Sequence, residues 1–85
     1  MSRETIVISR KYMLIHSGDD YVVVDTGSPL SYHTSGQLSF CGISHECQTS
    51  IVGVDGIIGY ELFSRYKLLY QNKRLYICLS YHLQS

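Results

Sequence analysis

The sequence predicts a mainly β domain with one short helix, and three observations support this fold class. The 85-residue chain contains eight tyrosines and many valines and isoleucines, which favour strands. Its apolar runs are short and end at Gly, Asn, Asp or Ser, which favour turns. One stretch after Gly59 has the apolar spacing of a short helix.

The first quarter of the chain predicts a three-strand meander. Residues 5–8 and 12–16 form an opening hairpin around the polar turn 9–11. Residues 17–20 then turn the chain into a third strand over residues 21–24, which carries three β-branched valines. We therefore expect this third strand to be partly buried and rigid.

The rest of the chain alternates short strands with turns and contains the one helix. Two short strands are expected over residues 37–41 and 48–52. A β-branched strand over residues 54–58 leads into the helix, expected over residues 60–66, which has an apolar side. A closing hairpin over residues 67–77 completes the domain.

Length and charge limit the organisation and the partners. The 85 residues make a single domain over residues 1–85, and a chain of this size is marginally stable alone, so association would help. Seven basic and seven acidic residues cancel, so neither nucleic acid nor a membrane is an expected partner. Residues 1–4 do not resemble a secretory signal, and we expect a cytoplasmic location.

The three cysteines do not indicate a disulfide scaffold, because their number is odd. Cys78 lies in an apolar strand and is expected to be a buried, inert thiol. Cys41 and Cys47 would bridge a small hairpin if they were oxidised, which a reducing compartment disfavours.

Zinc is an alternative role for the same segment. His33, Cys41, His45 and Cys47 provide four potential ligands, and four ligands complete a structural zinc site. Their spacing lacks the paired Cys-x2-Cys knuckle of common sites, and neighbouring residues on a strand face opposite sides. We therefore expect no metal ion and no cofactor.

A carboxylate stands on the turn that follows the strand over residues 21–24. The turn consists of Asp25, Thr26, Gly27 and Ser28. Such a sequence is often an ordinary strand-ending turn. It also holds one carboxylate at the end of a rigid strand, which is half of what a paired-acid active site requires.

Two segments together resemble the single-lobe, retropepsin-like aspartic proteases. They are Val-Val-Val-Asp-Thr-Gly-Ser over residues 22–28 and Gly-Ile-Ile-Gly-Tyr-Glu-Leu-Phe-Ser-Arg-Tyr over residues 56–66. The resemblance covers about residues 5–79 and leaves residues 80–85 as a tail. It implies a small, closed, β-barrel-like retropepsin fold with one short helix, and a two-fold dimer with both chain ends at the interface.

The resemblance also implies roles for the matching residues. Asp25 is the catalytic acid, Thr26 bonds across the dimer, and Gly27 lets a substrate strand approach. Ser28 either donates to the Asp25 carboxylate, lowering its pKa, or bonds to its own turn. The second motif is structural and comprises Ile57, Ile58 and Gly59.

Paired-acid hydrolysis of a peptide bond requires two carboxylates. One takes a proton from water, and the other, protonated, donates to the carbonyl oxygen. Asp55 precedes Gly56 and is expected to be a turn residue, so a homodimer must supply the second Asp25. The expected function is a homodimeric aspartic endopeptidase that acts on a peptide or protein substrate.

The interval between the two motifs is short. Residues 28–56 comprise 29 positions, whereas the resemblance implies a longer interval that carries a Gly-rich flap. Only residues 41–47 offer such a tip, so we expect a shortened flap. The alternative function is a catalytically weak or inactive retropepsin-like module for dimerisation or peptide binding.

Overall fold

The computed structural model describes residues 3–17, 19–49 and 53–80. It confirms a mainly β domain with one short helix. In chain order the elements are β1 (Arg3–Ser9), β2 (Tyr12–Ser17), β3 (Asp20–Val24), β4 (Tyr32–His33), β5 (Gln37–Phe40), β6 (Ile43–Glu46), β7 (Gly56–Ile58), α1 (Tyr60–Phe63), β8 (Tyr66–Gln71) and β9 (Arg74–Leu79).

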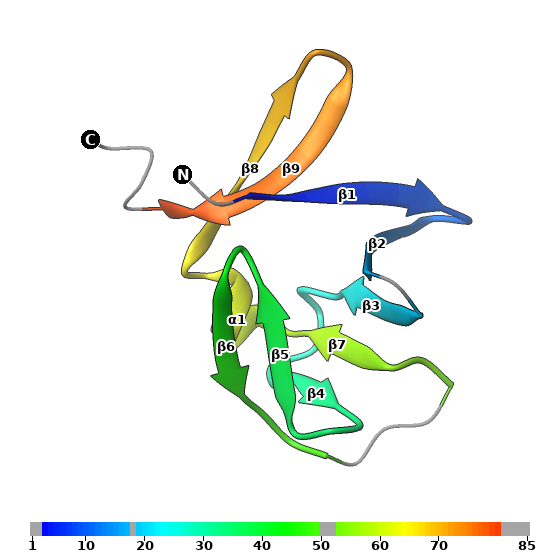
Figure 1. Ribbon diagram of the computed structural model, residues 1–85, viewed down its shortest axis with the longest axis vertical. Helices are drawn as coiled ribbons and strands as arrows, with labels where there is room; N and C mark the ends of the chain where they lie inside the picture. Colours follow the sequence, from blue (N-terminus) through cyan, green and yellow to red (C-terminus); the bar gives the residue numbers. More distant parts are fainter. Residues whose placement is uncertain (1–2, 18, 50–52, 81–85) are drawn as a thin grey trace.

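Seven strands form one sheet in the order β4-β7-β3-β2-β1-β9-β8, and β5 pairs with β6 in a separate hairpin. The β3–β7 pair is parallel, while the other neighbours are antiparallel. Figure 1 shows the β8–β9 hairpin projecting from one end of the molecule, with β4 and β7 towards the other. The β3–β7 pair places the two sequence motifs side by side.

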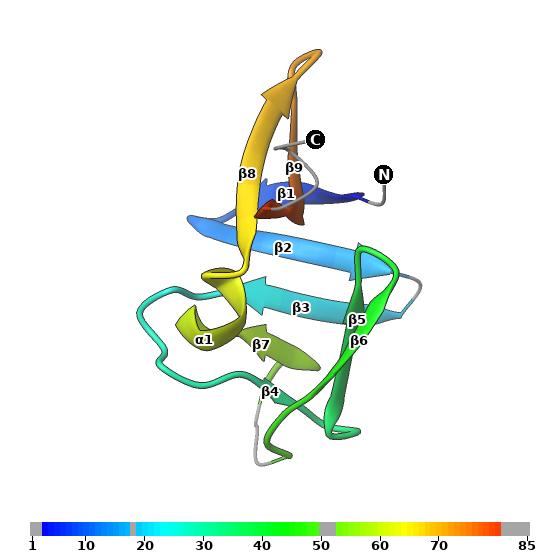
Figure 2. The same ribbon diagram turned by 90° about the vertical axis from the view of Figure 1, so that its left-hand side faces the viewer.

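The expected closed, barrel-like sheet is not found among the described residues, although the mainly β class is confirmed. Among the described residues, the sheet ends at β4 and β8, which do not pair with each other. The β8–β9 hairpin is paired along its whole length and extends away from the core instead of curling back to β4 (Figures 1 and 2). The sheet therefore keeps two edge strands.

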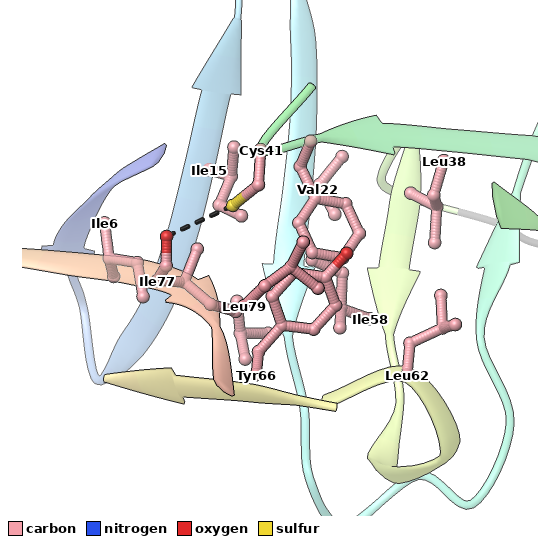
Figure 3. Close-up of a cluster of buried hydrophobic side chains, with 12 residues drawn as sticks. Ile6, Ile15, Val22, Leu38, Cys41, Ile58, Leu62, Tyr66, Ile77 and Leu79 are labelled. Atoms are coloured by element: carbon pink, nitrogen blue, oxygen red, sulfur yellow. Dashed lines mark hydrogen bonds between the residues drawn. The ribbon is translucent and has the colours of Figure 1, made fainter. Parts of the chain in front are cut away.

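The core lies between the sheet and the β5–β6 hairpin. Figure 3 shows Ile15, Val22 and Ile58 of the sheet in one cluster with Leu38 and Cys41. Ile58 is 0% exposed and Leu38 is 1% exposed. Since burying one large aliphatic side chain contributes about 1.5–3 kcal/mol, this cluster dominates the stability of the domain.

Most of the expected elements are confirmed. The meander over residues 5–8, 12–16 and 21–24 is β1, β2 and β3, and the closing hairpin is β8 and β9. The helix is shorter than expected, because it ends at Phe63 and Tyr66 already begins β8. No helix in the described part of the chain is long and apolar enough to cross a membrane.

The middle of the chain differs from the prediction. The strand expected over residues 37–41 is β5, and it pairs with β6, a strand that was not expected. Gln48 makes an isolated bridge with Tyr32, and residues 50–52 lie outside the described residues. Residues 81–85 of the expected tail also lie outside them.

The turn between β5 and β6 was expected to be the tip of a flap, but its first residue, Cys41, is buried in the core, while Gly42 is exposed. Cys41 is 2% exposed, and its Sγ donates to the carbonyl oxygen of Ile77 at 3.1 Å (Figure 3). Its backbone N–H donates to Oε1 of Glu4 at 3.2 Å. The hairpin tip is therefore anchored to β1 and β9. All three cysteines are free thiols, so the alternative disulfide between Cys41 and Cys47 is absent.

The buried Cys41 thiol predicts a loss of stability at alkaline pH. Burial, followed by the negative charge of Glu4, raises the pKa of Cys41 from 9.0 to about 11. The unfolded chain therefore releases this proton first. The contribution of the protonated thiol to the free energy of unfolding is fully present below pH 9.0 and is lost as the pH rises through about 11. Urea unfolding of wild type and Cys41→Val across this range measures the contribution. If the free energy of unfolding fell equally steeply with pH for the two chains, the predicted contribution of Cys41 would be contradicted.

Candidate functional site

Asp25 lies where the parallel pair β3 and β7 ends. Val23 pairs with Ile57 and Val24 with Ile58, and the N–H of Asp25 donates to the carbonyl oxygen of Ile58 at 2.9 Å. The ladder thus continues one residue beyond β3 and fixes the backbone that carries the carboxylate. The Asp25 residue itself is exposed.

The turn after Asp25 is closed by local hydrogen bonds. The N–H of Gly27 donates to Oδ1 of Asp25 at 3.1 Å, and the N–H of Ser28 donates to the Asp25 carbonyl oxygen at 3.1 Å. The Ser28 hydroxyl donates to the carbonyl oxygen of Leu30 at 2.8 Å, so the turn-bonding alternative holds in the single chain. Thr26 is exposed on the same turn.

The segment after this turn is bonded to the start of α1. The N–H of Tyr60 donates to the carbonyl oxygen of Ser28 at 2.7 Å, and that of Glu61 donates to Pro29 at 3.3 Å. The N–H of Gly59 donates to Oγ of Ser31 at 2.8 Å, and the Ser31 N–H donates to Oε1 of Glu61. Ser31 is 0% exposed, so the two motifs are joined by a buried polar network.

Gly59 permits this close approach. A Cβ built on Gly59 would lie 2.2 Å from the carbonyl oxygen of Leu30 and 2.7 Å from that of Ser28. Its φ of −88° is available to any residue, so the requirement for glycine is purely steric. Gly59 therefore allows the loop after Asp25 to pack against the second motif.

Asp55 lies at the other end of the β3–β7 pair. Its Oδ2 accepts the N–H of Tyr21 at 2.8 Å, and its own N–H donates to the Tyr21 carbonyl oxygen at 3.1 Å. An open hollow at this end is lined partly by Tyr21, Thr34 and Asp55, and Asp25 does not line it. Asp55 is thus a structural turn residue, placed away from Asp25 within the chain.

The β5–β6 hairpin does not cover Asp25. In Figure 2 the hairpin crosses the end of the sheet where β3 begins, whereas Asp25 follows the opposite end of β3. Its tip also bonds to β1 and β9, as described for Cys41. Among the described residues, this hairpin is therefore no lid for the Asp25 carboxylate, and the carboxylate is open to solvent.

The four potential zinc ligands are not brought together. No group of three or more His, Cys, Asp or Glu side chains in the described segments is arranged to hold a metal ion. His33 bonds to Asp20, Cys41 bonds to Ile77, and Nε2 of His45 lies 2.5 Å from the Tyr66 hydroxyl. Burial, together with the positive charge of Arg65, lowers the pKa of His45, which favours its neutral form.

The sequence did not indicate the pairing of His33 with Asp20. Nε2 of His33 lies 2.9 Å from Oδ1 of Asp20, and Nδ1 accepts the N–H of Ser35 at 3.0 Å. Because Nδ1 accepts this bond, Nε2 carries the proton and donates to the carboxylate. The network ties β4 to the start of β3. No short motif connects these residues, which are 13 positions apart.

Comparisons with protein-family models, with curated proteins and with solved structures found no match for this chain.

Proposed function

We propose that the chain is a homodimeric aspartic endopeptidase. The observation that carries the proposal is the Asp25 carboxylate, which is exposed at the end of the parallel β3–β7 pair and fixed by backbone hydrogen bonds. A rigid backbone and a solvent-open acid are what a site that activates water requires. The resemblance of both sequence motifs to retropepsin-like proteases supports the same reaction.

The reaction needs Asp25 from both chains. One Asp25 carboxylate takes a proton from a water molecule, whose oxygen attacks the carbonyl carbon of the scissile bond. The protonated Asp25 of the second chain donates to the carbonyl oxygen, giving a tetrahedral intermediate. Breakdown of this intermediate breaks the C–N bond: the first Asp25 passes the proton taken from water to the leaving amine, and a hydroxyl of the intermediate returns a proton to the second Asp25. Two close carboxylates share one proton because like charges repel, an effect well established for aspartic proteases as a class.

The proposal takes the partner acid from a second chain, and three other acids of this chain are already bonded within the fold. Asp20 bonds to His33, Asp55 accepts the N–H of Tyr21, and Glu61 accepts the N–H of Ser31. A two-fold interface brings each residue near its own copy. The small size of the chain supports association for a separate reason, its limited core. A peptide or protein is the proposed substrate, and a cytoplasmic location stays a prediction.

A second candidate function is a non-catalytic module for dimerisation or peptide binding. The observation that favours it is the anchoring of the β5–β6 hairpin tip through the buried Cys41, which leaves the described face at Asp25 without a lid. A site that does not exclude water loses part of its positioning advantage. Incubation of the chain with a pool of unstructured peptides separates the candidates. New peptide termini that depend on Asp25 support the peptidase, and intact peptides support the module.

A further inference from the structure

The outer edge of β8 has no partner strand among the residues that the structure describes. Among the described residues, β8 ends the sheet and pairs only with β9. Asn72 and Lys73 both have positive φ, as a two-residue hairpin turn requires, so Gln71 and Arg74 form a hydrogen-bonded pair. By alternation, Leu68 and Tyr70 direct their backbone N–H and C=O groups outward.

A backbone contact beyond the hairpin agrees with this alternation. The N–H of Ser80 donates to the carbonyl oxygen of Arg65 at 3.1 Å, so Arg65 points its carbonyl group towards the β9 side. Residues 67, 69 and 71 share this direction, and residues 68 and 70 have the opposite one. The edge therefore offers regularly spaced donors and acceptors to an added strand.

The two faces of β8 differ in chemistry. Leu68 and Tyr70 lie on the face that continues the core and are 42% and 72% exposed. Ile8 extends the same face from β1 and is 68% exposed. Lys67 lies on the opposite face of the sheet. It pairs with Cys78 of β9, and Cys78 pairs in turn with Arg3 of β1, so Lys67 and Arg3 share this face. An added strand would meet the exposed Leu68 and Tyr70 on one face, and the exposed Lys67 beside the half-buried Leu69 on the other.

Charge is strongly divided along the chain, although its formal sum is zero. All seven acidic residues lie at or before Glu61, while four of the seven basic residues lie at or after Arg65. These four are Arg65, Lys67, Lys73 and Arg74, and all are exposed. The β8–β9 hairpin thus presents positive charge that no acidic residue of its own segment neutralises.

We propose that the outer edge of β8 binds an extended acidic peptide, which adds a strand to the sheet. The outward backbone groups of Leu68 and Tyr70 bond to the peptide main chain. Apolar peptide side chains contact Leu68 and Tyr70, and alternate acidic side chains face Lys67. A second copy of this chain fits the same edge poorly, because β8 would meet β8 with like charges.

The proposal does not depend on the peptidase activity, because β8 contains none of the residues assigned to the Asp25 site. Binding is therefore measured on the Asp25→Asn chain, which prevents cleavage of the probe. The probe is a fluorescein-labelled, N-acetylated octapeptide of alternating Val and Glu, followed by fluorescence anisotropy. An alternating Val and Lys peptide and a labelled oligothymidine serve as comparison probes.

Proline substitutions test the backbone contact. Leu68→Pro removes an N–H that points outward while leaving the ladder to β9 intact, and prolines are tolerated in this position of edge strands. We expect the Val and Glu peptide to bind at least about tenfold more weakly to Leu68→Pro than to Leu68→Ala, which keeps the N–H. Tyr70→Pro against Tyr70→Ala gives the same comparison nearer the hairpin tip, if the first variant does not fold.

Charge reversal tests the electrostatic contact. The double variant Lys67→Glu with Arg74→Glu is expected to weaken binding by at least about tenfold. The matched variant Arg10→Glu with Lys11→Glu makes the same charge change in the β1–β2 turn and is expected to stay within about twofold. Equal affinity of the β8 variants and wild type, or tighter binding of oligothymidine than of the acidic peptide, would overturn the proposal. The proposal would also be overturned if the proline variants changed the self-association of the chain and left its affinity for the peptide unchanged.

Discussion

Gly59→Ala is expected to lower the free energy of unfolding by about 3–4 kcal/mol, an effect large enough to threaten the fold of a small domain. The added Cβ would lie 2.2 Å from the carbonyl oxygen and 2.5 Å from the carbonyl carbon of Leu30. These are backbone atoms and do not move aside as a flexible side chain does. Relief requires the segment after Asp25 to separate from the start of α1.

That separation would break the hydrogen bonds between the two motifs, including those of Tyr60 to Ser28 and of Gly59 to Ser31. Ser31 is 0% exposed, so its hydroxyl would lose a buried partner. Urea unfolding followed by circular dichroism measures the change, with thermal unfolding as a second readout.

Gly53→Ala is the matched control for Gly59→Ala. Gly53 has a φ of +96°, and no atom of the described residues lies within 4 Å of a Cβ built there. This substitution therefore costs backbone strain alone, about 1–2 kcal/mol. A Gly59→Ala chain that is no less stable than the Gly53→Ala chain would contradict the steric requirement for glycine at position 59.

Asp25→Asn is expected to reduce peptide cleavage by at least about a thousandfold at acid to neutral pH. The amide oxygen of Asn still accepts the N–H of Gly27, which Oδ1 of Asp25 accepts at 3.1 Å, so the turn keeps its geometry. The Asn amide, unlike the Asp25 carboxylate, cannot take a proton from water. Chain association and unfolding free energy should therefore stay close to those of wild type.

Asp55→Asn is the matched control for the loss of charge. Asp55 accepts the N–H of Tyr21 through Oδ2 at 2.8 Å, and an amide oxygen can accept the same bond. Cleavage by Asp55→Asn is expected to stay within a few-fold of wild type. Initial rates are measured on one peptide at equal protein concentration. Equal rates for wild type and Asp25→Asn would assign the cleavage to other residues.

Local sequence signals predicted most of the sheet. The valines over residues 21–24 and the β-branched run over residues 54–58 indicated β3 and β7, and the parallel pairing places Val23 beside Ile57. The closing hairpin over residues 67–77 was likewise predicted, and β8 pairs with β9 around Asn72 and Lys73. These elements form wherever short-range preferences and burial agree.

Long-range packing decided the elements that the sequence did not reveal. β4 has two residues, too few for a periodic signal, and exists because it pairs with β7. β6 carries Ser44, His45 and Glu46, which are polar or ionisable, and is a strand through its pairing with β5. The buried position of Cys41 also depends on contacts with β1 and β9, which lie far away in the sequence.

Only part of the candidate site could be predicted, because some of its contacts are local and others depend on long-range packing. The Asp25 turn is local, so the sequence indicated its place at a strand end. The Ser28 hydroxyl had two possible partners, and the path of the chain to Leu30 decides between them. Ser31 gave no signal in the sequence, although its buried hydroxyl accepts the N–H of Gly59 and joins the two motifs.

The central claim is that each chain contributes one of two acids to a shared site, and mixed dimers test it most directly. Wild-type and Asp25→Asn chains are unfolded together, refolded at fixed total concentration, and assayed for peptide cleavage across the range of mixing ratios. If both copies of Asp25 are needed, activity follows the square of the wild-type fraction, and an equal mixture keeps about one quarter of it. Activity proportional to the wild-type fraction, with about one half left in the equal mixture, would contradict the shared site.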